Sequence, residues 1–117
     1  MSSKRVYLDF LNDILESIEK IELFTEDMNF DQFKNDDKTT YATIRAFEII
    51  GEAAKEISNE IKVKYATIPW KEMASMRDKL IHAYFGVDLE VVWSTIHEDI
   101  STLKPLIKDV IENESKE

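Results

Sequence analysis

Apolar residues recur at steps of three and four positions through most of this 117-residue chain. That spacing places them along one face of an α-helix, whereas the apolar residues of a half-buried strand alternate at every second position. The pattern runs through residues 4–24, 38–60 and 89–110, and a further helical stretch follows Pro69. The chain holds only two Gly and two Pro, so it has few residues that break helices. The sequence therefore predicts an all-α fold rather than a sandwich or a barrel.

Capping residues define the ends of several expected helices. Asp36 and Asp88 stand where the second and fourth helices would begin, and aspartate is a favoured N-cap. The third helix is expected to begin near Pro69, a residue that fits the first helical turn. It should continue to about Tyr84 and end at Gly86, a plausible left-handed cap. Four helices joined by short connections predict an antiparallel four-helix bundle.

The length of the chain predicts a single domain over residues 1–117, because one core suits a chain of this size. Residues 25–36 are expected to form a loop with at most a short turn, and the bundle has room for one extra short helix. Gly51 lies within the second helix, where glycine is less favourable than alanine by about 1 kcal/mol. We expect the glycine to allow a close helix–helix crossing at that point.

The composition restricts the classes of function. The formal net charge is −9, from 24 acidic and 15 basic residues, which argues against gripping nucleic acid with the whole surface. There is no cysteine, so neither a disulfide framework nor a thiolate metal site is expected. The N-terminus lacks the apolar run of a signal peptide, and no apolar stretch is long enough to span a membrane. A cytoplasmic protein is therefore expected.

Residues 73–88, MASMRDKLIHAYFGVD, hold the residues most able to perform chemistry. Arg77 falls on the apolar stripe of the third helix, where a guanidinium needs an anion or several acceptors. One interpretation is a structural ion pair with a core carboxylate, for which Glu52 is a candidate. Asp78 and His82 are four residues apart, hence neighbours on one helical face. Aspartate can orient an imidazole for general-base catalysis, but the same pair can be an ordinary surface contact.

The combination Arg-Asp-x3-His-x-Tyr, formed by Arg77, Asp78, His82 and Tyr84, resembles the signature of HEPN ribonucleases. More specifically, it is similar to the HepT toxin subgroup, whose motif continues as Arg-x4-His-x-Tyr. The likeness extends to the segments FEIIGEAAKEIS (47–58), IPWKEMASMRDKLIHAYFGVD (68–88) and LEVVW (89–93). An isolated Arg-x4-His would be a weak signal, whereas a match in order along most of the chain is specific.

This resemblance implies a HEPN-type bundle that cleaves RNA, with transfer RNA or messenger RNA as candidate substrates. It implies catalysis by Arg77 and His82, support from Asp78, and neither a metal nor another cofactor. The active form would be a homodimer, or a larger oligomer of dimers, with the two motif helices facing each other. The resemblance further implies a type VII toxin–antitoxin system, in which an MntA nucleotidyltransferase attaches AMP to Tyr84. An inward-facing aromatic residue is the alternative interpretation of Tyr84.

Two other functions compete with a ribonuclease. One is a non-catalytic helical module that partners a nucleotidyltransferase or binds a nucleotide, which the net charge of −9 favours. The other is a purely structural helical dimer. The presence of both Arg77 and His82 favours the enzyme, because a scaffold would not need the two together.

Overall fold

The computed structural model describes residues 3–82 and 86–116, without the side chains of Ser3, Arg77, Ile81, His82 and Val87. Its elements, in chain order, are α1 (Ser3–Thr25), α2 (Phe30–Lys34), α3 (Asp37–Glu56), α4 (Asn59–Lys64), α5 (Trp70–Ala74), α6 (Met76–Leu80), β1 (Ile81–His82), β2 (Gly86–Val87), α7 (Leu89–Thr95), the π-helical turn η1 (Ile96–Ile100) and α8 (Ser101–Ser115).

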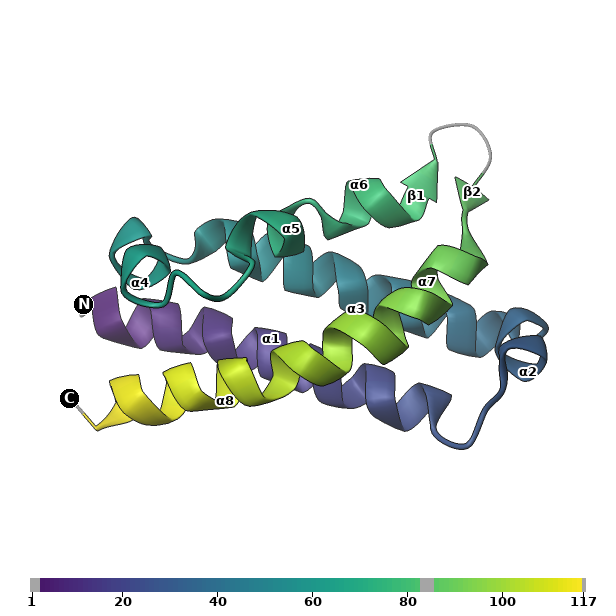
Figure 1. The fold of residues 1–117 in the computed structure, drawn as a ribbon, viewed down its shortest axis with the longest axis horizontal. Helices are drawn as coiled ribbons and strands as arrows, with labels where there is room; N and C mark the ends of the chain where they lie inside the picture. The colour runs from purple at the N-terminus through teal and green to yellow at the C-terminus, as the bar shows by residue number, and fades with distance from the viewer. Residues whose placement is uncertain (1–2, 83–85, 117) are drawn as a thin grey trace.

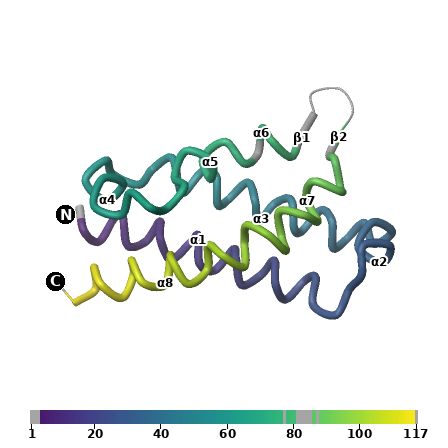
Figure 2. The backbone as a smooth tube through the Cα atoms, in the orientation of Figure 1, coloured from purple at the N-terminus to yellow at the C-terminus, as the bar shows by residue number. Residues whose placement is uncertain are grey.

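These elements form four rods that run alternately in opposite directions (Figure 1). The first two rods are α1 and α3, the third is α5 followed by α6, and the fourth is α7, η1 and α8. α1 begins and α8 ends at one end of the molecule, whereas β1 and β2 lie at the other (Figures 1 and 2). The expected all-α, antiparallel four-helix bundle is confirmed, with one short strand pair added to it.

The apolar stripes predicted from the sequence form the core. On α1, Leu11, Ile14, Ile18 and Ile21 have no exposed surface. Buried residues of α3, α5, α6 and the fourth rod complete a continuous apolar cluster. None of the helices in the described part of the chain combines the length and the apolar character needed to cross a bilayer.

The predicted N-caps are confirmed. The Asp36 side chain accepts a hydrogen bond from the Thr39 backbone N–H at 3.0 Å. The Asp88 side chain accepts from the backbone N–H groups of Glu90 and Val91, at 3.1 and 3.2 Å. These bonds satisfy amide groups that have no partner within the first helical turn.

The connection at residues 25–36, expected to be a loop with at most a short turn, contains the short helix α2. Asn29 and Gln32 form a reciprocal capping box at the start of α2. The second predicted helix, expected over residues 38–60, ends earlier, at Glu56, and the short helix α4 follows. The break falls at Ile57, whose backbone is extended.

The prediction of an unbroken third helix from Pro69 to about Tyr84 is wrong. The helix is interrupted at Ser75, whose hydroxyl donates to the backbone oxygen of Lys71 at 3.0 Å. It then ends at Leu80, because the Leu80 carbonyl accepts a hydrogen bond from the Asp88 N–H at 3.2 Å. Beyond Leu80 the backbone is extended and pairs with β2, so a local hairpin replaces the last expected turns.

Candidate functional site

The Arg-x4-His motif spans the junction between a helix and a strand. Arg77 and Asp78 belong to α6, and His82 is the last residue of β1. β1 pairs with β2 in antiparallel fashion, with His82 opposite Gly86. Gly86 has a φ of +75°, a left-handed conformation that glycine adopts at low cost. The side chains of Arg77 and His82, and all of Tyr84, lie outside the described residues.

Asp78 and His82 do not share a helical face, contrary to the prediction from their spacing. Residues four apart share a face only within one continuous helix, whereas Asp78 lies in α6 and His82 in β1. The catalytic roles of these residues stay predictions. The spacing of Asp78 and His82 along a helix no longer supports those roles.

A close backbone contact holds the third rod against α3. A Cβ atom added to Gly51 would lie 3.3 Å from the Met73 carbonyl oxygen and 3.4 Å from that of Ala74. The expected close crossing at Gly51 is therefore confirmed. Met73, Met76 and Leu80 then enter the core, each at most 6% exposed. These contacts fix the position of α5 and α6, and with it the backbone that carries the motif.

A second connection ties α6 to the fourth rod. The Lys79 ammonium group lies 3.6 Å from a carboxylate oxygen of Asp99, a residue of η1. Asp78, next to Lys79 in sequence, is exposed. Asp78, itself a residue of the motif, thus presents its carboxylate at the surface.

Glu52 is not a core carboxylate. Its side chain is 68% exposed, and it forms an ion pair with Lys55 at 3.7 Å within α3. Glu52 is therefore not the buried carboxylate expected for Arg77, and an ion pair between Arg77 and another core carboxylate stays a prediction, since the Arg77 side chain lies outside the described residues. A supporting role for Glu52 in the active site stays a prediction.

Both tryptophan side chains make contacts that anchor neighbouring segments of the fold. The Trp70 side chain is 6% exposed, and its indole N–H donates to the Tyr65 carbonyl at 3.1 Å. Trp93 packs against Phe33, with ring centroids 5.1 Å apart, and carries the exposed His97 edge-on at 4.4 Å. His97 thus contacts an aromatic ring on the surface of the fourth rod.

One buried charge was missed by the sequence analysis. Glu114 is 2% exposed. Its carboxylate accepts hydrogen bonds from the hydroxyl groups of Tyr7 at 2.9 Å and Tyr65 at 2.5 Å, and it pairs with the Lys64 ammonium group at 2.8 Å. The ammonium group, followed by the two phenols, lowers the pKa of Glu114 to about 2.

The Glu114 cluster lies at the end of the bundle opposite the motif (Figure 1). It joins α1, the last residue of α4 with the residue that follows it, and α8. Its position was visible in the sequence, since Leu103, Ile107, Val110 and Glu114 continue the same steps of four and three. The geometry indicates a structural role for this carboxylate, because its oxygens are satisfied within the fold.

Comparison with known proteins identifies the family. The profile named "Ribonuclease HepT-like" matches residues 14–110, which include the complete motif. The chain belongs to the ribonuclease HepT-like family. No solved structure matches it significantly.

The relatives in this family align over most of the chain. A protein of Thermococcus cleftensis named probable ribonuclease HepT is 58% identical over 86% of this chain and 92% of its own length. A candidate RNase of Methanocaldococcus jannaschii is 44% identical over 92% of this chain and 99% of its own length. A third relative, from the same organism, is named a gamma-glutamylcyclotransferase and candidate RNase. It is 49% identical over 92% of this chain, but this match covers 48% of that longer protein.

Proposed function

We propose that this chain is a toxin that cleaves cellular RNA internally, without a metal ion, and that Arg77 and His82 perform the cleavage. Membership of the ribonuclease HepT-like family is the single observation that carries the proposal. The positions of the two residues, on α6 and immediately after it in β1, are compatible with a shared site at one end of the bundle.

In the proposed reaction the imidazole of His82 removes the proton of a ribose 2′-hydroxyl group. The 2′-oxygen attacks the adjacent phosphorus, and the bond from phosphorus to the 5′-oxygen breaks. The leaving oxygen takes up a proton, so the products are a 2′,3′-cyclic phosphate and a 5′-hydroxyl. The guanidinium of Arg77 would stabilise the additional negative charge on phosphorus in the transition state. Asp78 would orient one of these two side chains.

The proposed active species is a homodimer, or an oligomer of dimers, in which two copies of the motif form one cleft. The formal net charge of −9 limits RNA binding to a local region, since phosphate contacts depend on Lys and Arg. A cleft shared by two copies of Arg77 would concentrate positive charge at that place.

The proposed inhibitor is an MntA-type nucleotidyltransferase. In its reaction the hydroxyl oxygen of Tyr84 attacks the α-phosphorus of ATP, diphosphate leaves, and the hydroxyl proton passes to a base. The resulting phosphodiester would place an anion close in sequence to Arg77 and His82, where it would compete with the RNA phosphate. Incubation with such an enzyme and ATP should add one or more adenylyl groups, and Tyr84→Phe should abolish the addition.

Cleavage itself is tested with the purified chain and total RNA, followed by mapping of the new ends. Arg77→Ala or His82→Ala should reduce cleavage by about a hundredfold or more, by analogy with removal of a catalytic group. The chain supplies matched controls, because Arg45 and His97 are exposed residues outside the motif. Arg45→Ala and His97→Ala should retain activity. Equal activity of the wild type and of the Arg77→Ala, His82→Ala double variant would refute the catalytic assignment.

A non-catalytic module that holds a nucleotidyltransferase or a nucleotide is the second candidate, favoured by the acidic net charge. It predicts that the same double variant is as harmless as the wild type during expression without a partner. The ribonuclease proposal predicts growth arrest by the wild type alone, relieved in both single variants.

A further inference from the structure

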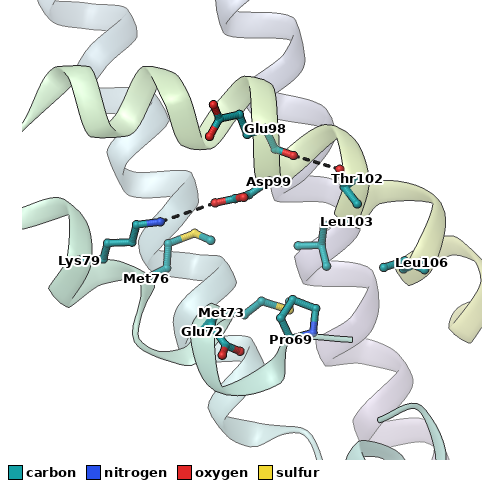
Figure 3. Close-up of a pocket in the computed structure, with 10 residues that line it drawn as sticks. All are labelled: Pro69, Glu72, Met73, Met76, Lys79, Glu98, Asp99, Thr102, Leu103 and Leu106. Carbon is teal, nitrogen blue, oxygen red and sulfur yellow. Dashed lines mark hydrogen bonds and ion pairs between the residues drawn. The ribbon is translucent and has the colours of Figure 1, made fainter. Parts of the chain in front are cut away.

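A groove separates the third rod from the fourth, beside the helix that carries the motif. Its volume is about 370 Å³, within the range of about 300–1,000 Å³ typical of ligand sites. Figure 3 shows side chains of both rods lining it. Its apolar lining consists of Pro69, Met73, Met76, Leu103 and Leu106.

The polar lining of this groove is predominantly acidic. It comprises Glu72, Glu98 and Asp99 together with Lys79 and Thr102 (Figure 3). Lys79 pairs with Asp99, and the Thr102 hydroxyl donates to the Glu98 backbone oxygen at 3.0 Å. The carboxylates of Glu72 and Glu98 have no ion-pair partner within the described part of the chain. Two exposed carboxylates whose negative charge is not balanced by an ion pair therefore flank the apolar floor of the groove.

We propose that this groove binds a segment of another protein that presents apolar side chains flanked by Lys or Arg. The apolar side chains would occupy the floor, where methionine adapts its shape to different partners. The basic residues would pair with Glu72 and Glu98. This charge complementarity is the observation that selects the occupant.

The same charges disfavour two other occupants. An RNA strand would bring phosphates against three carboxylates and a single ammonium group. A second copy of this chain that presented the same groove across a two-fold axis would set its own Glu72, Glu98 and Asp99 against these carboxylates. A basic, amphipathic protein segment meets neither form of repulsion.

Occupation of the groove would reach the motif helix directly. A basic side chain near Asp99 would compete with Lys79, which lies 3.6 Å from that carboxylate. Lys79 is two residues from Arg77 in α6. A partner at this surface would thus act on the backbone that carries the motif without needing to enter the catalytic cleft. The binding proposal does not depend on the ribonuclease proposal.

Methionine methyl groups report on the groove. Met73 and Met76 line it, whereas Met28 lines a different pocket, formed with Glu26, Asp27 and Ile96. The full chain, labelled with ¹³C at the methionine methyls, is titrated with a synthetic helical peptide carrying Leu on one face and Lys and Arg beside it. We expect saturable shifts of the Met73 and Met76 signals and an unchanged Met28 signal. The same peptide with every Lys and Arg replaced by Glu should cause no shift.

Charge reversal on the protein provides the matched control. Glu72→Lys combined with Glu98→Lys should weaken peptide binding by about tenfold or more. Asp109→Lys combined with Glu112→Lys makes the same change of charge at exposed positions of α8 outside the groove, and should weaken it far less.

Several results would overturn the proposal. They are the absence of any shift with the basic peptide, equal shifts with the acidic peptide, and equal weakening by both double variants. Shifts of Met73 and Met76 caused by a short RNA but not by the peptide would identify an RNA site instead. Shifts that grow with protein concentration alone would identify a contact between copies of the chain.

Discussion

The Lys79 ammonium group lies 3.6 Å from a carboxylate oxygen of Asp99 and so links the motif helix α6 to the π-helical turn η1. The two residues are far apart in sequence and belong to different rods of the bundle. The contact therefore joins α6 to the fourth rod.

Replacement of either member of this pair should have a small effect on stability. Both side chains are about half exposed, at 57% and 52%, and exposed ion pairs contribute about 0–1 kcal/mol. We expect Lys79→Met to lower the free energy of unfolding by less than about 1 kcal/mol, measured by urea denaturation. Lys20→Met, which removes an exposed pair within α1, is the control. A much larger loss for Lys79→Met alone would show that the contact is more strongly coupled to the fold than its exposure implies.

Gly51→Ala should destabilise the chain despite the higher helix propensity of alanine. The new methyl group would lie 3.3 and 3.4 Å from two backbone oxygens of α5, and backbone cannot rotate away as a side chain can. We expect a net loss of about 1 kcal/mol, the packing penalty exceeding the propensity gain. Thermal denaturation measures the change, and Gly51→Val should be worse. A more stable Gly51→Ala protein would mean that α5 moves away at little cost.

Gly51→Ala should also lower RNA cleavage, if the chain is the proposed ribonuclease. The displaced α5 would carry α6 and Arg77 with it, and catalysis is sensitive to small displacements of catalytic groups. Activity assays at a temperature where the variant is folded separate this effect from unfolding. Unchanged activity would indicate that the motif is positioned by other contacts.

Glu114 makes stability dependent on acid pH. Its pKa is about 2 in the folded chain and 4.5 without the fold, so the folded state favours the charged form by on the order of 3 kcal/mol. Because the folded pKa is the lower one, this stabilisation is present above about pH 4.5 and is lost as the pH falls towards 2. Glu114→Gln should flatten the dependence of unfolding free energy on pH in that window. Glu112→Gln, the same substitution at an exposed position of α8, should leave the pH dependence of the unfolding free energy unchanged. A flatter dependence for Glu112→Gln than for Glu114→Gln would contradict the assignment.

Thr43→Val should stabilise the chain. The Thr43 side chain is fully buried, and its hydroxyl has no hydrogen-bond partner in the described structure. Valine keeps the shape and removes the unsatisfied group, so we expect a gain of about 1 kcal/mol and a higher melting temperature. Thr43→Ser keeps the hydroxyl but loses a methyl group, and should be less stable than the wild type. A destabilised Thr43→Val protein would indicate that the hydroxyl is satisfied, for example by water.

The sequence was most informative where apolar periodicity and helix-capping residues indicate the same helix. The steps of three and four placed Leu11, Ile14 and Ile18 in the core correctly, and Asp36 and Asp88 marked helix starts by ordinary capping chemistry. It failed at the end of the motif helix. There the outcome depends on a hydrogen bond between Leu80 and Asp88 and on strand pairing across Gly86, which apolar periodicity does not reveal.

Glu114 illustrates a different kind of failure. Its position on the apolar stripe was readable, but its burial depends on Tyr7 and Lys64, which are remote in sequence. Only the folded arrangement shows that three donors meet one carboxylate. The motif residues present the reverse case, since the family signature points to Arg77 and His82, whose side chains lie outside the described residues, and their catalytic roles stay a prediction.

The antiparallel order of the four rods brings the start of α1 and the end of α8 together, at the pole opposite the β1–β2 hairpin (Figure 1). An affinity tag, a fluorophore or a whole appended domain joined before α1 or after α8 would therefore be attached at the pole opposite β1 and β2. Covalent attachment at that pole suits experiments that require β1 and β2 to stay unobstructed.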